Sequence, residues 1–177
     1  MNLQRSQAGF SFVELLFVML IGVVLYGVML APSEATKRKR EMAQCAENLR
    51  KLHLTLELYA NEHDGAYPAD RTARRTEDVF RLLTPQYTTD TSFLSCPAKG
   101  GGYTYAMGLR KDSGLQILAA DRLATSTLTN GTPLFSKEGN HGDGGGNALF
   151  TDGHVESLGA TAPRELSLPP SVILINP

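Results

Sequence analysis

Three groups of residues in this chain have types and spacing that could do chemistry. A single carboxylate, Glu14, lies in a run from Phe10 to Ala31 that is otherwise uncharged. Cys45 and Cys96 are the only two cysteines. A glycine-rich segment near the end carries further groups that titrate or bind metals, namely His141, Asp143, Asp152 and His154. The chemistry to consider is charge pairing inside a membrane, disulfide formation and metal binding.

The run from Phe10 to Ala31 is long enough to cross the hydrocarbon core of a membrane as a helix. An ionised group at that depth costs a few kcal/mol, so Glu14 predicts a functional position. A secretory signal peptide is the first alternative, but its apolar region is shorter and small residues follow it. Here Pro32-Ser33-Glu34 and a basic cluster follow. We therefore expect the helix to be retained as a membrane anchor.

The two cysteines predict a disulfide if the domain that carries them is exported, because the bacterial periplasm is oxidising. Two buried free thiols are the alternative, which the sequence leaves open. A bridge between Cys45 and Cys96 would contribute about 4 kcal/mol in the chain-entropy model. Two cysteines provide too few ligands for a metal site, so we do not expect a metal there.

The apolar pattern predicts that helix continues from Ala35 to about Asn61, with Pro32 kinking or interrupting it. Leu54 and Leu58 widen its apolar face, and glycine at Asp64-Gly65 favours an end there. The residues that form the face recur at spacings of three and four: Met42, Cys45, Ala46, Leu49, Leu52, Leu56, Tyr59 and Ala60.

After Cys96 the pattern changes to short apolar runs separated by turn residues, which favours strands. These runs are 102–107, 115–120 and 132–135. The clearest hairpin joins 147–151 to 154–158 through Asp152-Gly153, a pair that favours a tight turn. The fold class expected is α+β, with a long N-terminal helix, half transmembrane and half amphipathic, packed on a small antiparallel β-sheet head.

Composition and motifs argue against several functions. The charge is nearly balanced, with 17 basic and 18 acidic residues, so we expect no nucleic-acid partner. The sequence has no nucleophile elbow, no zinc-protease helix and no phosphate-binding loop. We therefore expect no enzymatic activity and no catalytic residues.

The N-terminal residues Gly9-Phe10-Ser11-Phe12-Val13-Glu14 resemble the processing site of type IV prepilins and of the pseudopilins of type II secretion. The resemblance implies that a prepilin peptidase cuts after Gly9 and methylates Phe10. Glu14 is then the acidic fifth residue of the mature chain. It would pair with the new amine of a neighbouring subunit, since a buried charge is tolerable when paired.

Later segments also resemble pilin-like proteins. Cys45 to Arg50, Leu58 to Gly65, Tyr67-Pro68 and Cys96-Pro97 match a large bacterial group of this kind. A C-terminal signature in such proteins is a histidine, nine residues and Asp-Gly. Here ten residues separate His141 from Asp152-Gly153, one more than in that signature.

Two interpretations of this C-terminal segment stay open. In the first, His141, Asp152 and Gly153 have a structural role in a glycine-rich turn. In the second, Asp143 and Asp152 bind Ca²⁺ through oxygen ligands, as the late loop of the major pseudopilins does.

The expected organisation is a leader (1–9), an assembly helix (10–31), its amphipathic extension (32–64), an α+β head (65–161) and a proline-containing tail (162–177).

The resemblance implies a structural subunit of a type IV pilus-like or type II secretion pseudopilus filament. Its expected location is the inner membrane, single-pass with a periplasmic head, and then a periplasmic or surface filament. The expected partners are prepilin peptidase, other pilin-like subunits, an inner-membrane assembly platform and membrane lipid. The alternative is a single-pass periplasmic binding or sensor protein that does not polymerise.

Overall fold

The fold is taken from a computed structural model, which describes residues 11–30, 33–98, 101–124, 133–135, 139–142, 145–159 and 168–177. The chain divides into two compact units, Met1–Lys37 and Arg38–Pro177, and each is described by itself. The class is α+β, because an apolar N-terminal helix precedes a head with a five-stranded antiparallel sheet.

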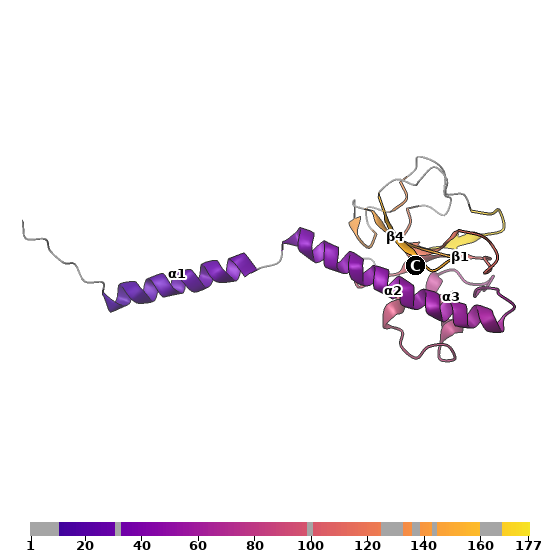
Figure 1. Cartoon of the computed structure of the whole chain (residues 1–177), viewed down its shortest axis with the longest axis horizontal. Helices are drawn as coiled ribbons and strands as arrows, with labels where there is room; N and C mark the ends of the chain where they lie inside the picture. Colours follow the sequence, from indigo (N-terminus) through magenta and orange to yellow (C-terminus); the bar gives the residue numbers. More distant parts are fainter. Residues whose placement is uncertain are drawn as a thin grey trace, which may run out of the picture. The chain divides into compact units, whose positions relative to one another are not determined.

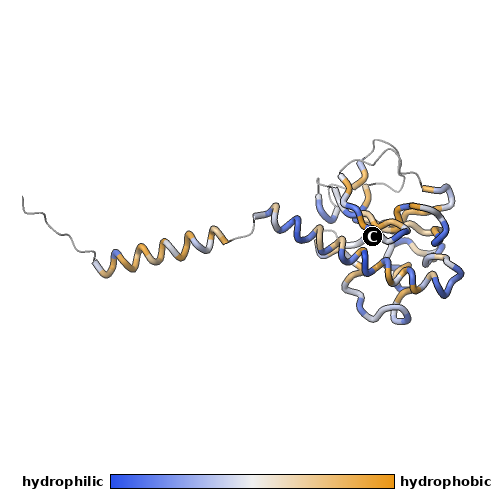
Figure 2. Tube along the Cα trace, in the orientation of Figure 1, coloured by the Kyte–Doolittle hydropathy of each residue, from blue (hydrophilic) through white to orange (hydrophobic). Residues whose placement is uncertain are grey.

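Helix α1 (Phe12–Leu30) consists almost entirely of apolar residues and contains one charged residue, Glu14. Figure 2 shows it as hydrophobic along its length. None of its residues is buried within the chain. Helix α2 begins at Glu34, and Pro32, where the sequence predicts a kink or a break, lies outside the described residues.

Helix α2 (Glu34–Glu62) supplies one side of the core of the head. It starts after Ser33, whose hydroxyl accepts a hydrogen bond from the backbone N–H of Thr36. It ends where predicted, because Gly65 takes a positive φ of 79° and donates its N–H to the carbonyl of Ala60. Its buried residues lie at helical spacing: Cys45, Asn48, Leu49, Leu52, Thr55, Leu56 and Ala60.

The predicted apolar face is too wide. Leu54 and Leu58 are 65% and 54% exposed, so they lie outside the core. Two polar residues, Asn48 and Thr55, are buried instead. The Asn48 side chain donates a hydrogen bond to the carbonyl of Ser95, and the Thr55 hydroxyl donates to the carbonyl of Lys51 in the same helix. These bonds offset the cost of burying polar groups.

The sheet contains β1 (Tyr103–Met107), β2 (Ile117–Asp121), β3 (Gly146–Phe150), β4 (Val155–Leu158) and β5 (Ile173–Ile175). Its order is β4-β3-β2-β1-β5, and every neighbouring pair is antiparallel. Every residue of β1, β2 and β3 is buried, so both faces of the central strands are covered. Figure 1 shows α2 running beside this sheet, with which it shares a core.

The predicted hairpin is confirmed, since β3 and β4 pair on either side of Asp152-Gly153. The predicted run 132–135 is not a strand in its described part, where Phe135 makes only an isolated bridge to Leu123. Between α2 and β1 the chain forms α3 (Thr76–Phe80) and two 3-10 turns, η1 (Arg81–Leu83) and η2 (Ser92–Leu94).

The C-terminal segment differs from the predicted organisation. The sequence predicts a proline-containing tail over 162–177, yet residues 173–175 form β5 and pair with β1. Leu174 and Ile175 are buried. The reason is that β1 is left with a free edge, and the short apolar run after Pro169-Pro170 pairs with it.

Candidate functional site

The structure describes one of the three predicted processing residues. Glu14 lies in the first turn of α1, whereas Gly9 and Phe10 lie outside the described residues. Within the described part of the chain, α1 is the one helix long and apolar enough to cross a membrane. Glu14 is therefore a lone carboxylate near the start of a helix whose other side chains favour hydrocarbon.

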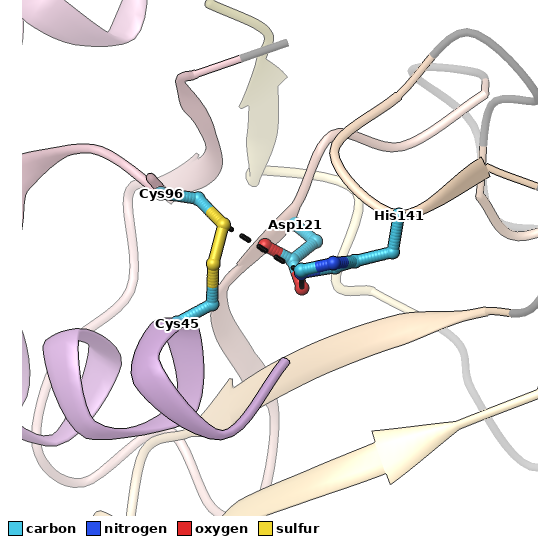
Figure 3. Close-up of side chains that lie close together, drawn as sticks. All are labelled: Cys45, Cys96, Asp121 and His141. Carbon is cyan, nitrogen blue, oxygen red and sulfur yellow. Dashed lines mark hydrogen bonds and ion pairs between the residues drawn. A yellow bond between two sulfur atoms is a disulfide. The ribbon is translucent and has the colours of Figure 1, made fainter. Parts of the chain in front are cut away.

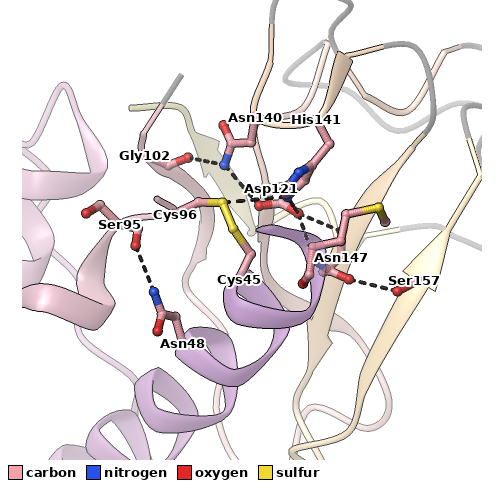
Figure 4. The surroundings of a disulfide bond; sticks show 11 residues. Cys45, Asn48, Ser95, Cys96, Gly102, Asp121, Asn140, His141, Asn147 and Ser157 are labelled. Carbon is pink, nitrogen blue, oxygen red and sulfur yellow. Dashed lines mark hydrogen bonds and ion pairs between the residues drawn. A yellow bond between two sulfur atoms is a disulfide. The ribbon is translucent and has the colours of Figure 1, made fainter. Parts of the chain in front are cut away.

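Cys45 and Cys96 are joined by a disulfide, with their Cα atoms 5.1 Å apart. Cys45 lies in α2, and Cys96 follows η2. The bridge therefore ties the helix to the irregular segment that precedes the sheet (Figure 4). Both cysteines are buried.

Asp121, at the end of β2, is the centre of a buried polar cluster beside this disulfide. Its carboxylate accepts hydrogen bonds from the Asn140 side chain (2.9 Å) and from the backbone and side-chain amides of Asn147 (2.7 and 3.2 Å). The Nε2 atom of His141 lies 3.2 Å from Asp121 Oδ2. A buried carboxylate is costly alone, so these donors explain how it is accommodated.

The same donors fix the cluster to the surrounding elements. Asn147 also donates to the carbonyl of Met42 in α2, and its oxygen accepts from Ser157 in β4 (Figure 4). Asn140 also donates to the carbonyl of Gly102 just before β1. Helix, sheet and loop therefore meet at one set of polar contacts.

His141 faces both the carboxylate and the disulfide. Its Nε2 atom lies 3.6 Å from Cys96 Sγ as well as 3.2 Å from Asp121 Oδ2 (Figure 3). The side chains of His141 and Asp121 are 0% and 2% exposed, which separates them from solvent. Burial, followed by the negative charge of Asp121, raises the pKa of the neighbouring Tyr103.

Asp152 and Gly153 lie elsewhere, in the β3–β4 turn. Asp152 accepts a hydrogen bond from the backbone of His154 and lies 2.6 Å from its Nδ1, and these contacts lower the Asp152 pKa. Gly153 has a φ of 89°, and a Cβ there would lie 2.6 Å from Nε2 of His53 in α2. Only glycine fits this approach without a shift of the histidine.

The sequence motif that groups His141 with Asp152-Gly153 thus contributes to two separate places, the Asp121 cluster and the hairpin turn. The calcium alternative needs Asp143, which lies outside the described residues. Sequence reasoning missed Asp121, Asn140 and Asn147. The available signal was an aspartate directly after the apolar run Ile117–Ala120, a position that a buried strand rarely gives to a charge.

The cluster brings together four groups able to bind a metal: the two cysteine sulfurs, the Asp121 carboxylate and the His141 imidazole. With the sulfurs bonded to each other, its chemistry is that of a hydrogen-bonded, cross-linked core. Comparisons of the chain with protein-family models, curated proteins and solved structures found no match.

Proposed function

We propose that this protein is a structural subunit of a type IV pilus-like or type II secretion pseudopilus filament, trimmed by a prepilin peptidase and held in the inner membrane before assembly. The observation that carries the proposal is α1, an apolar helix with a lone carboxylate near its start and no residue buried in its own chain. Such a helix needs lipid or other helices around it.

The position of Glu14 supports assembly rather than anchoring alone. Cleavage after Gly9 would leave a charged amine on Phe10, one helical turn before the carboxylate. In a bundle of staggered copies, the amine of one subunit can lie beside Glu14 of the next. Pairing would remove the cost of both charges and set the stagger, while apolar contacts hold the bundle together.

The head supports an extracytoplasmic location. Its disulfide is of a kind that persists in oxidising compartments and is rare in the cytosol. One face of α2 and an antiparallel sheet form the core of the head. In the sequence α2 follows α1, so the chain passes from the apolar helix into a folded domain.

The first test is processing. The full chain is produced in a bacterial host with and without a prepilin peptidase, and its N-terminus is determined by mass spectrometry. We expect the chain to begin at methylated Phe10 only when the peptidase is present. Gly9→Leu should retain the leader, because it changes the residue that precedes the cleaved bond.

The matched control is Gly22→Leu, which places the same side chain at a glycine inside α1 with open space around it. This variant should be trimmed like the native chain. If the leader stays attached while the same peptidase trims a known prepilin, the filament proposal fails. The protein would then be a single-pass membrane protein that does not polymerise.

A further inference from the structure

The buried cluster beside the disulfide contains a complete set of zinc ligand types. Cys45 Sγ, Cys96 Sγ, a carboxylate oxygen of Asp121 and a ring nitrogen of His141 all lie within 4.8 Å of one another (Figure 3). They come from four different segments of the head, and all four residues are buried. Four-coordinate sites built from sulfur, nitrogen and oxygen are typical of zinc.

The distances suit tetrahedral coordination. With zinc bonds of about 2.0 Å to nitrogen and oxygen and about 2.3 Å to sulfur, the edges of the tetrahedron are about 3.3 Å for N–O and about 3.5 Å for N–S. The structure has 3.2 Å from His141 Nε2 to Asp121 Oδ2, and 3.6 Å from the same nitrogen to Cys96 Sγ. Both distances from His141 Nε2 therefore already match the edges of a zinc tetrahedron, and the other ligand atoms lie within 4.8 Å.

We propose that the dithiol form of this protein binds one zinc ion through Cys45, Cys96, Asp121 and His141, and that disulfide formation releases it. In the dithiol form the two sulfurs are free to separate to about 3.8 Å, the tetrahedral S–S edge. The Nε2 atom of His141 then donates its lone pair to the metal. The proposal does not depend on filament assembly.

The residues around the cluster are placed to orient these ligands. Asn140 and Asn147 donate to the Asp121 carboxylate and hold it towards His141. Hydrogen bonds of this kind to a ligating carboxylate raise the affinity of a metal site. The two sulfurs favour zinc over calcium or magnesium, which prefer oxygen ligands.

The release step balances with a protein disulfide as oxidant. The two zinc-bound thiolates give two electrons to the disulfide of a thiol oxidoreductase, and the Cys45–Cys96 bond forms as that disulfide breaks. The oxidant leaves as two thiols after taking up two protons from water, and Zn²⁺ leaves because its two sulfur ligands are now bonded to each other. Zinc would thus hold α2 on the sheet until the covalent bond replaces it.

The test uses the full chain in non-ionic detergent, reduced with a phosphine and titrated with Co²⁺ as a spectroscopic probe. We expect one Co²⁺ per chain, with the visible bands of tetrahedral cobalt and a thiolate charge-transfer band, displaced by Zn²⁺. His141→Ala and Asp121→Asn should each weaken binding at least about tenfold, since even changes to residues that only orient ligands cost about 10- to 100-fold. His154→Ala, an exposed histidine in the hairpin, should bind like the native chain.

Two results of the Co²⁺ titration would overturn the proposal. One is a folded, reduced native chain that shows no tetrahedral cobalt spectrum. The other is undiminished binding by folded His141→Ala, which would mean that the cysteines act alone. A measurement on the native chain avoids variants that fail to fold: a disulfide oxidant should release one zinc ion for every two thiols lost, and zinc retained after oxidation would also contradict the proposal.

Discussion

At the scale of single residues, the head is held together by polar groups that meet specific partners. The Asp121 cluster is one example, and Glu57 in α2 is another. Tyr67 donates its hydroxyl to Glu57 at 2.7 Å, and Lys111 contacts the same carboxylate at 2.5 Å. Burial by itself raises the pKa of Glu57, but these hydrogen bonds and the charge of Lys111 outweigh it, so the pKa is lowered from 4.5.

This shift predicts how acid affects stability. A carboxyl group with a lowered pKa stabilises the fold above its unfolded pKa, and the contribution is lost as the pH falls through the folded value. Glu57→Gln should therefore lower the free energy of unfolding at pH 7, and the difference from the native chain should shrink below about pH 4.5. Chemical denaturation at a series of pH values measures this.

The control for Glu57 is Glu47→Gln, which removes a carboxylate paired with Arg50 on the same helix. Both partners there are more than half exposed, so the change should affect stability little at neutral pH. A Glu57→Gln effect that is the same at pH 7 and well below pH 4.5 would show that Glu57 acts through packing rather than charge.

At the scale of elements, α2 has one buried face, and this face is narrower than the apolar pattern predicts. Leu52 is 0% exposed, whereas Leu54, two residues later, is 65% exposed. Residues that are two apart in an α-helix point in directions about 200° apart, so Leu52 and Leu54 lie on opposite sides of α2.

A pair of identical substitutions tests this face. Leu52→Ala should lower the free energy of unfolding of the head by about 2–5 kcal/mol, because it leaves a cavity in the core. Leu54→Ala should change it by less than about 0.5 kcal/mol. Near-ultraviolet circular dichroism of the full chain in detergent, followed through urea unfolding, gives both values. Equal losses would contradict the assigned face.

At the scale of the whole molecule, the proposed function depends on α1 meeting other copies of itself. After cleavage, each subunit would bring one amine and one Glu14 carboxylate into the bundle. Removing one member of a buried pair leaves the other charge without a partner, which costs several kcal/mol. Without this charge pair, only apolar contacts would favour the packing of α1 in a filament.

Glu14→Ala should therefore be trimmed normally but assemble at least about tenfold less, because the amine of Phe10 would be buried unpaired. The matched control is Glu34→Ala, which removes an exposed carboxylate at the start of α2 and should assemble like the native chain. Electron microscopy and the yield of sheared filaments, in a host that supplies a pilin assembly platform, measure this. Full assembly by Glu14→Ala would mean that the carboxylate does not pair as proposed.

The sequence alone determined the features that depend on local pattern. The apolar run predicts α1, the spacing of Cys45, Leu49, Leu52 and Leu56 predicts the buried face of α2, and Asp152-Gly153 predicts the β3–β4 turn. These features arise from hydrophobic periodicity and backbone preference, which act between residues close in the chain.

Only the tertiary structure decided which distant residues meet. Asp121, Asn147 and His141 are brought to the disulfide by pairing of β2 with β3 and by packing of α2 on the sheet. The strand β5 belongs to the sheet because β1 offers it an edge. Contacts of this kind depend on how separate elements pack, so the spacing of residues along the chain does not predict them.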